Sequence, residues 1–318
     1  MTTTREPAIS TAGLTKSFGR KAVLDGIDLS VPQGTIFSLL GPNGAGKTTT
    51  VQILSTLIPY DGGEVRVAGH DPRREPDAVR ASIGVTGQFA AVDRFLTGEE
   101  NLILMARLHH LGRREGRRRA SELLERFDLT DAARKPLATY SGGMRRKLDL
   151  AMGLMGRPSI VFLDEPTTGL DPRSRRTMWD IVRDLAAAGV TIFLTTQYLD
   201  EADELADRIA VLDHGELIAE GTPGELKRLV PGGHISLRFT DAADLDAAAR
   251  ALGEVSRDDE ALTLQVPSEG DLRSLRTLLD RMDAAAVRPE GLQVHTPDLD
   301  DVFLALTGRT ENEKDMVR

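Results

Sequence analysis

The segment from Gly41 to Thr49 reads Gly-Pro-Asn-Gly-Ala-Gly-Lys-Thr-Thr and matches the pattern of a phosphate-binding loop. Its glycines let successive backbone N–H groups turn inward around phosphates, which Cβ atoms would obstruct. Lys47 supplies a positive charge to the β and γ phosphates, and Thr48 offers its hydroxyl to Mg²⁺. The segment therefore predicts a nucleoside triphosphate site formed by Gly41, Pro42, Asn43, Gly44, Ala45, Gly46, Lys47, Thr48 and Thr49.

Two carboxylates, Asp164 and Glu165, follow the apolar run Ile160–Leu163. Asp164, at the end of an expected strand, is placed to hold the Mg²⁺ shell beside the loop. Glu165 is expected to point elsewhere and to accept a proton from the attacking water. The alternative is that the two acids only cap a strand and begin a turn. Asp171 alone is typical of a turn residue ahead of Pro172.

A second candidate anion site lies at Ser141, Gly142 and Gly143, where a small hydroxyl and two glycines precede an expected helix. The loop at 41–49 already accounts for one triphosphate. A second helix terminus that can bind phosphate suggests a site that another subunit completes.

These residues must be positioned by an α/β framework. Strand-length apolar runs alternate with amphipathic helical stretches over residues 8–230, which is typical of a nucleotide-binding domain, and residues 98–154 form a mostly helical subdomain. After residue 233, the order β-α-β-β-α-β predicts a small, ferredoxin-like α+β accessory domain over 234–308. The elements expected near the site are hairpins at 9–31 and 208–220, strands at 35–40, 159–163 and 190–196, and helices at 47–57 and 173–187.

The composition excludes several classes of function. The net charge of −9 argues against nucleic acid as the main partner, because such proteins usually need a basic surface. The chain has no cysteine, so disulfides, thiolate zinc sites and a cysteine nucleophile are excluded. No apolar run approaches the ~20 residues that a membrane-spanning helix needs. We therefore expect a cytoplasmic chain whose membrane role, if any, depends on a partner.

Five motifs in this order resemble the nucleotide-binding subunit of ABC transporters: the loop at 41–49, Gln88, Ser141–Gly143, Asp164–Glu165 and Asp171. The resemblance covers roughly residues 8–230. It implies an ABC-type nucleotide-binding fold that hydrolyses ATP with Mg²⁺. It further implies that two copies of the chain enclose two ATP molecules head to tail. Each ATP would lie between the loop of one copy and the Ser141–Gly143 segment of the other.

The resemblance assigns roles to further residues. Gln88 would bind Mg²⁺ and relay its state to a separate polytopic membrane permease, and Asp171 would belong to the nucleotide site. Phe18 falls where the family stacks an aromatic ring on adenine. The alternative for Phe18 is a core residue of the hairpin at 9–31.

Two residues depart from the family pattern. Tyr140 replaces the usual leucine before the signature serine, which we interpret as a packing change. Gln197 follows an expected strand at the position where the family usually has histidine. Glutamine can donate a hydrogen bond but cannot carry a proton charge. We therefore assign the catalytic base to Glu165 and interpret Gln197 as a γ-phosphate sensor.

The segments Gln197–Asp203 and Leu299–Gly308 resemble the daunorubicin/doxorubicin-resistance branch of the family. This implies export of a hydrophobic, drug-like compound, with the chain bound peripherally at the cytoplasmic face of the membrane. Alternatives are an exporter of lipid or polysaccharide, or a soluble ABC ATPase that transports nothing. The second segment has an alternative of its own, in which Val302 and its apolar neighbours only close the small domain.

Overall fold

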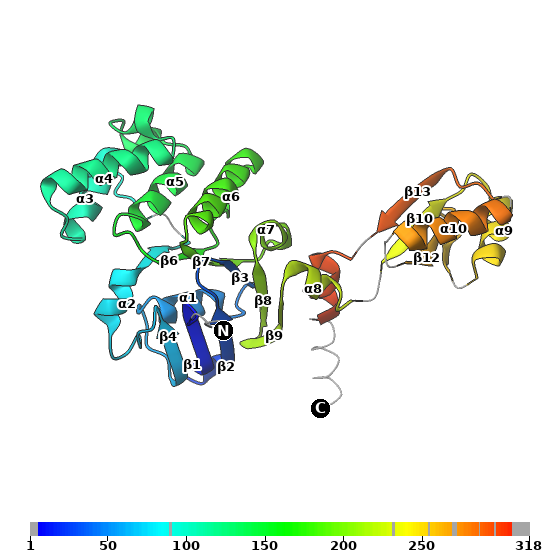
Figure 1. Cartoon of the computed structure of the whole chain (residues 1–318), viewed down its shortest axis with the longest axis horizontal. Helices are drawn as coiled ribbons and strands as arrows, with labels where there is room; N and C mark the ends of the chain where they lie inside the picture. Colours follow the sequence, from blue (N-terminus) through cyan, green and yellow to red (C-terminus); the bar gives the residue numbers. More distant parts are fainter. Residues whose placement is uncertain are drawn as a thin grey trace, which may run out of the picture. The chain divides into compact units, whose positions relative to one another are not determined.

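The computed structural model describes residues 6–88, 91–230, 233–253, 255–268, 272–285, 287–295 and 297–306. The chain divides into two compact units, Met1–Pro223 and Gly224–Arg318, whose elements are labelled in Figure 1. Residues 307–308, the end of the predicted accessory domain and of the Leu299–Gly308 segment, lie outside the described residues. Among the described residues, no helix is both long enough and apolar enough to cross a membrane.

The first unit contains two sheets and the helices that cover them. Its strands are β1 (Ile9–Phe18), β2 (Lys21–Val31), β3 (Ile36–Leu40), β4 (Gly62–Val67), β5 (Ile83–Thr86), β6 (Ile160–Asp164), β7 (Thr191–Thr196), β8 (Arg208–Asp213) and β9 (Glu216–Gly221). Its helices are α1 (Lys47–Leu54), α2 (Pro76–Ser82), α3 (Gly98–Leu108), α4 (Arg113–Arg126), α5 (Gly142–Gly153), α6 (Pro172–Ala187) and α7 (Leu199–Leu205), with short 3₁₀ turns at Thr130–Ala132 and Leu137–Thr139.

The central sheet has the strand order β5-β6-β7-β3-β8-β9. Its first five strands run parallel to their neighbours, and β9 pairs with β8 in the antiparallel direction. The carboxyl ends of β6, β7 and β3 therefore lie next to one another at one edge of the sheet. Ligands bind at this edge in open α/β sheets.

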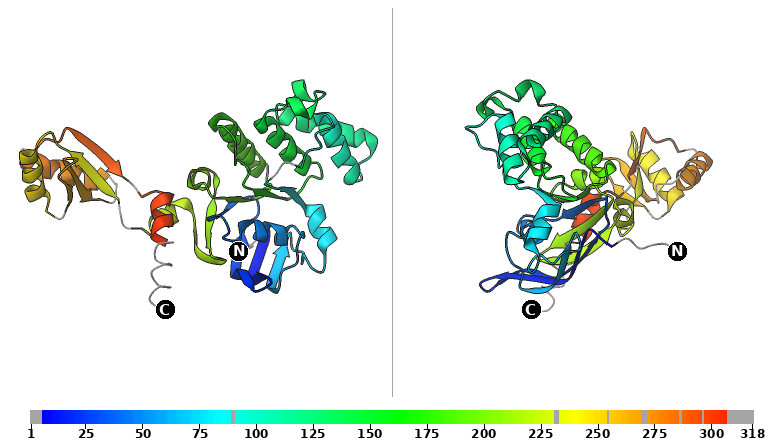
Figure 2. Two further views of the ribbon diagram at one scale, coloured as in Figure 1. Left: turned by 180° about the vertical axis from the view of Figure 1, so that it is seen from behind. Right: turned by 60° about the vertical axis from the view of Figure 1, so that its left-hand side comes forward.

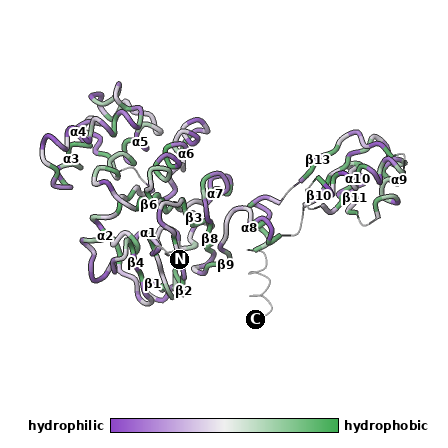
Figure 3. The backbone as a smooth tube through the Cα atoms, in the orientation of Figure 1, coloured by the Kyte–Doolittle hydropathy of each residue, from purple (hydrophilic) through white to green (hydrophobic). Residues whose placement is uncertain are grey.

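The central strands are buried on both faces because side chains alternate between two cores. On β3, Ile36 packs with α3 to α6, whereas Phe37 packs with α1 and the smaller sheet. Helices α1 and α5 thus contact opposite faces of the central sheet. In Figure 3, α4 and α6 show hydrophilic and hydrophobic stretches side by side, as expected of helices with one buried face.

The smaller sheet has the strand order β2-β1-β4 and begins with the hairpin predicted over 9–31. This hairpin is confirmed, since β1 and β2 pair in antiparallel register from Ile9↔Val31 to Phe18↔Lys21. The hairpin predicted over 208–220 is also confirmed as β8 and β9. Figure 2 shows the smaller sheet and α1 on the same side of the central sheet from two further directions.

Helix α1 is shorter than the predicted helix over 47–57. It ends at Leu54, and two residues later Thr56 adopts a φ of 65°. The hydroxyl of Ser55 donates to the carbonyl of Val51 at 2.7 Å. A residue in the left-handed conformation ends an α-helix. The apolar residues at 57–58 fit the helical spacing in the sequence, but they lie beyond the end of α1.

The second unit has the predicted order β-α-β-β-α-β. After α8 (Pro223–Lys227), its elements are β10 (His234–Arg238), α9 (Ala242–Leu252), β11 (Ser256–Asp258), β12 (Thr263–Pro267), α10 (Leu272–Ala284) and β13 (Gly291–His295). The antiparallel sheet order β11-β12-β10-β13 is that of a ferredoxin-like fold, so the predicted fold class is confirmed. Residues 299–306 form a final helix, in which Leu299 and Val302 are buried.

Candidate functional site

The loop predicted to bind phosphate connects β3 to α1. Gly46 has a φ of 114° and precedes the helix. A Cβ atom on Gly41 would lie 2.2 Å from the carbonyl oxygen of Leu212 on β8. Glycine is therefore required at both positions, at Gly46 by backbone conformation and at Gly41 by the close approach of a neighbouring strand. Ala45 accepts a hydrogen bond from the backbone N–H of Gly215 at 3.1 Å.

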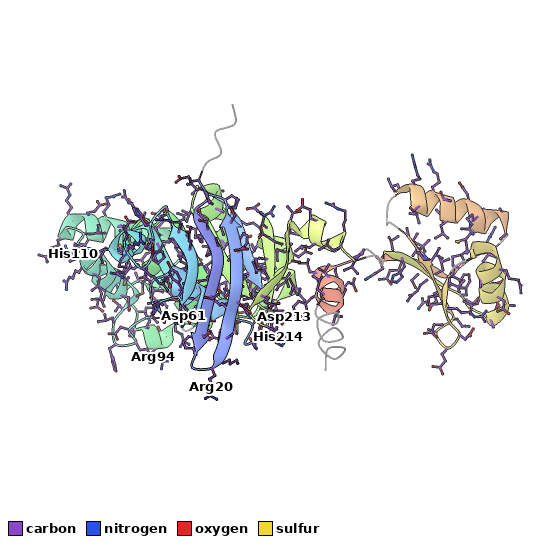
Figure 4. All side chains as sticks on the ribbon, turned by 90° about the horizontal axis from the view of Figure 1, so that it is seen from below. Arg20, Asp61, Arg94, His110, Asp213 and His214 are labelled. Carbon is purple, nitrogen blue, oxygen red and sulfur yellow. The ribbon has the colours of Figure 1, made fainter. Side chains whose placement is uncertain are left out.

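The β8–β9 turn thus supports the loop from outside. Figure 4 labels Asp213 and His214 at this turn, and the His214 imidazole lies 2.9 Å from the Asp213 carboxylate. The turn and the loop are far apart in the chain, so no sequence signal relates the two segments.

The ammonium group of Lys47 lies inside the loop. It donates to the carbonyl oxygens of Gly41 at 2.8 Å and Pro42 at 3.1 Å, and it lies 3.5 Å from Oε1 of Glu165. Burial lowers the pKa of Lys47, while the negative charges of Glu165 and Asp164 act in the opposite direction. A lysine with carboxylate partners and an anion-binding loop around it is suited to hold phosphate.

Asp164 ends β6 next to two hydroxyl groups. Its Oδ1 accepts hydrogen bonds from Thr195 at 2.5 Å and from Thr48 at 3.3 Å. Thr195 lies directly opposite Asp164 because β6 and β7 are paired in parallel register. The structure therefore brings together Thr48 and Asp164, two of the three predicted Mg²⁺ ligands.

Glu165 joins the same cluster, contrary to the expectation that its side chain points elsewhere. Its φ of 47° breaks the alternation of the strand, so the carboxylate turns toward Lys47. The backbone N–H of Glu165 donates to the carbonyl oxygen of Thr195 at 3.1 Å. A left-handed conformation at a non-glycine residue costs about 1–3 kcal/mol and persists where the surroundings fix it, often at functional sites.

Gln88 follows β5 and reaches the same carboxylate. Its side-chain amide donates to Oε2 of Glu165 at 3.5 Å, and the hydroxyl of Thr168 donates to that oxygen at 3.4 Å. Gln88 is exposed, whereas Glu165 is buried. The amide is thus an exposed group in contact with the buried acid.

The predicted second anion site, at 141–143, lies apart from the cluster around Lys47. Ser141 is the N-cap of α5 and accepts a hydrogen bond from the backbone N–H of Met144 at 3.2 Å. Ser141 and Gly142 are exposed. Helices α5 and α1 contact opposite faces of the central sheet. Within one chain, the N-terminus of α5 therefore does not lie against the loop at 41–49. Within the described ranges, no hydrogen bond or ion pair joins 141–143 to 41–49.

Asp171 is the N-cap of α6. It accepts hydrogen bonds from the backbone N–H groups of Arg173 and Ser174, each at 3.0 Å, and from the Ser174 hydroxyl at 2.6 Å. The bonds from Ser174 lower the pKa of Asp171. A Cβ atom on Gly143 would lie 2.7 Å from that hydroxyl. Gly143 therefore lies close to Ser174, which binds Asp171, and both residues belong to this second region.

Tyr140 and Gln197, the two residues that depart from the family pattern, occupy different environments. Tyr140 is buried, and its hydroxyl donates to the carbonyl oxygen of Ala132 at 2.7 Å, which agrees with a packing change. Gln197 is half-buried and directly follows β7. Since β7 lies between β6 and β3, Gln197 stands at the sheet edge where the loop and the acids are found.

Phe18 is not a core residue of the hairpin, so that alternative is wrong. It ends β1 with 52% of its surface exposed, and the ammonium group of Lys16 lies 5.2 Å from its ring centroid. Lys16 also pairs with Asp61 at 3.0 Å. Figure 4 shows Arg20 at the tip of this hairpin, beyond Phe18 in the chain, and Asp61 beside it. The exposed ring is available for stacking.

Two residues at the site were not predicted. Thr195 links Asp164 to the backbone of Glu165, and Arg146 on α5 donates to the carbonyl oxygens of both acids. A signal for Arg146 exists in the sequence: Arg146 and Asp149, three residues apart, interrupt an otherwise apolar helix face. No comparable signal marks Thr195.

Comparison with known proteins relates these features to a family. Residues 24–168 match the model of the family described as ABC transporter. The chain is 50% identical to the daunorubicin resistance ATP-binding protein DrrA2 of Streptomyces coeruleorubidus, over 96% of this chain and 97% of the relative. It is 48% identical to the daunorubicin/doxorubicin resistance ATP-binding protein DrrA of Streptomyces peucetius, over 99% and 96%.

A solved structure is similar in fold to part of this chain. The ATP-binding cassette MJ0796, determined as a dimer in a post-hydrolysis state bound to ADP and Pi, is 26% identical with a TM-score of 0.61. The match covers 67% of this chain and 98% of that one.

Proposed function

This chain belongs to the ABC transporter family of ATP-binding proteins, and from that premise we propose that it powers export of a hydrophobic, drug-like compound through a separate membrane permease. It is the ATP-hydrolysing subunit of a transporter. The observation that carries the proposed cargo is the similarity to the daunorubicin resistance proteins, which extends over both units of the chain. The similarity therefore includes the accessory unit as well as the ATPase unit.

ATP fits the loop at 41–49. The close approach of Leu212 to Gly41 leaves no room for a side chain there, and Lys47 provides the charge for the phosphates. We assign adenine stacking to the exposed ring of Phe18. Mg²⁺ fits Thr48, Asp164 and Gln88, because one carboxylate plus phosphate oxygens is the usual ligand set for this ion. When bound, Mg²⁺ neutralises phosphate charge.

Hydrolysis requires a base near the γ-phosphate, and we assign this role to Glu165. Its Oε2 is held by Gln88 and Thr168, and its Oε1 lies against Lys47. Phosphate in the loop would compete for the Lys47 ammonium group and so release Oε1 to accept a proton from water. Gln197 would donate a hydrogen bond to the γ-phosphate.

A second copy of the chain would complete each site. The exposed N-terminus of α5 consists of Ser141, Gly142 and Gly143. Within one chain, it lies away from the phosphate-binding loop at 41–49. In a head-to-tail dimer, this terminus would bind the nucleotide held by the partner, with Asp171 fixing the neighbouring turn. We further propose that the dimer binds a polytopic permease at the cytoplasmic face of the membrane, with Gln88 relaying the state of the site.

The test is transport by membranes that contain the chain and the membrane protein that copurifies with it. Inside-out vesicles should accumulate doxorubicin, used as the probe, when ATP and Mg²⁺ are supplied. Vesicles with the Glu165→Gln variant should contain the same amount of both proteins and accumulate none.

The experiment tests the drug cargo and the transport role separately. A copurifying permease and active ATP hydrolysis without doxorubicin uptake would contradict drug export and favour a lipid or polysaccharide cargo. Copurification of soluble partners alone would contradict transport and favour a non-transport ATPase.

A further inference from the structure

Arg146 on α5 is a buried cation that binds the backbone of the catalytic region. It is 7% exposed. Its guanidinium donates to four carbonyl oxygens, those of Gly87 at 2.6 Å, Pro166 at 2.8 Å, Asp164 at 3.1 Å and Glu165 at 3.3 Å. The planar, five-donor guanidinium can serve these separate acceptors at once, which a lysine ammonium cannot.

Asp149, one helical turn further along α5, is the acidic partner of Arg146. Its Oδ2 lies 3.4 Å from Nη1 of Arg146, and its Oδ1 accepts a hydrogen bond from the backbone N–H of Ala91 at 2.9 Å. Asp149 is 4% exposed. The pair therefore binds the chain on both sides of Gln88, at Gly87 through Arg146 and at Ala91 through Asp149.

Stability alone is a weak reason for this arrangement. Desolvation disfavours both charges, so burial lowers the pKa of Arg146 and raises that of Asp149. Well-packed apolar residues often stabilise a core as well as a buried ion pair does. The acceptors themselves point to another role, since they lie in the segments that carry Gln88, Asp164 and Glu165.

We propose that Arg146 and Asp149 form a positioning pair that fixes Gln88 and Glu165 relative to α5. The pair acts through the backbone of the residues proposed to bind the nucleotide and the attacking water. The N-cap of the same helix is Ser141, so a displacement of α5 would be transmitted to the acid and to Gln88. This inference rests on the roles proposed above for Gln88 and Glu165.

The first test is Arg146→Lys in the full-length chain, with ATP and Mg²⁺ as the probes. Lysine keeps the charge but loses the multiple donors. We expect kcat to fall roughly tenfold to hundredfold, because small misplacements of catalytic groups have effects of this size. The KM for ATP should change by less than about twofold, since binding energy from the loop is retained. The Mg²⁺ concentration for half-maximal turnover should rise, as it should in Gln88→Ala.

Arg119→Lys is the matched control. Arg119 is a half-buried arginine of the same helical layer, and it donates to the carbonyl oxygen of Leu154 at 3.1 Å, near the other end of α5. Its substitution removes a helix-to-backbone contact without touching the catalytic segments, so kcat and Mg²⁺ dependence should stay at the wild-type values. Equal effects of Arg119→Lys and Arg146→Lys would overturn the positioning role, as would an unchanged kcat in Arg146→Lys.

Asp149→Asn provides a second test that does not depend on how well Arg146→Lys folds. Asparagine is nearly the same shape, but its neutral amide oxygen accepts from Ala91 more weakly than a carboxylate does, and it no longer balances the charge of Arg146. In both variants, amide hydrogen exchange of the peptide containing Ala91 should be faster, whereas α4 peptides should exchange at the wild-type rate. Unchanged exchange at Ala91 in Asp149→Asn would overturn the inference. Normal turnover in Glu165→Gln would instead overturn the proposed function.

Discussion

The cluster around Lys47 and the terminus at Ser141 are both suited to phosphate, but they differ in what surrounds them. Lys47, Asp164 and Glu165 are buried within one chain, where Lys47 pairs with Glu165 and Thr195 links Asp164 to the backbone of Glu165. Ser141 is exposed, and its hydroxyl accepts a hydrogen bond from the backbone of its own helix. The first region holds its catalytic groups in place by itself, whereas the second presents a helix terminus outward.

The contrast indicates how each region depends on other molecules. A buried network fixes geometry before substrate arrives, as catalysis requires. An exposed helix terminus with free N–H groups and a positive dipole gains its function when an anion on another surface approaches. Substitutions in the two regions should therefore have different effects on turnover and on ATP binding.

The largest effect is expected for Glu165→Gln. The amide keeps the size of the side chain and can still contact Lys47, but it cannot accept a proton. Loss of a general base lowers kcat by roughly 10²–10⁴-fold, while ATP binding should be retained. Steady-state turnover and binding of a fluorescent ATP analogue measure the two quantities. Near-normal turnover would contradict the assignment of Glu165 as the base.

A smaller loss is expected for Ser141→Arg, which fills the exposed terminus. Turnover should fall roughly tenfold or more because donors to the developing phosphate charge are lost, with ATP binding by the single chain unchanged. The control is Thr97→Ala, which removes the N-cap of α3 in the same layer. Both substitutions remove a cap at a cost of about 1 kcal/mol, so a stability effect alone would reduce turnover equally in the two variants.

Mixing two impaired variants sharpens this prediction. A dimer of one Lys47→Ala copy and one Ser141→Arg copy has one site in which both regions are intact. An equal mixture should recover about a quarter of wild-type turnover, since half of the dimers are mixed and each has one of two sites. Recovery of no activity would contradict the head-to-tail arrangement.

Phe18→Ala should have a moderate effect on nucleotide binding. Aromatic stacking contributes about 0.5–1.5 kcal/mol, so the Kd for ATP should rise by roughly two- to tenfold. The value of kcat at saturating ATP should not change, because the ring lies outside the buried cluster. Phe18→Tyr keeps the ring and serves as the control. An unchanged Kd in Phe18→Ala would remove Phe18 from the site.

The smallest effect is expected for Gln197→His. Both side chains can donate a hydrogen bond, so turnover should stay within about threefold of the wild type. Steady-state ATPase assays over a range of ATP concentrations measure this. Complete loss of turnover would be inconsistent with the role of a γ-phosphate sensor.

Much of the fold could be predicted because its signals are local. The loop at 41–49, both hairpins and the β-α-β-β-α-β order of the second unit follow from glycine positions and apolar spacing. The end of α1 was predicted incorrectly, because the left-handed conformation of Thr56 has no marker in the sequence. The orientation of Glu165 was missed for a similar reason: its positive φ depends on the hydrogen bonds that hold its backbone to Thr195.

The amino-acid sequence by itself identified the groups that are predicted to bind phosphate, the two acids that follow a nearby strand, and a second helix terminus of the same kind. Only the tertiary structure decided the partners of these groups. It placed Thr195 against Asp164 and directed the guanidinium of Arg146 to the backbone around Gln88. It also left Phe18 exposed. The physical reason is that backbone geometry and residue chemistry act over a few neighbouring residues, whereas strand order and helix packing join segments far apart in the chain.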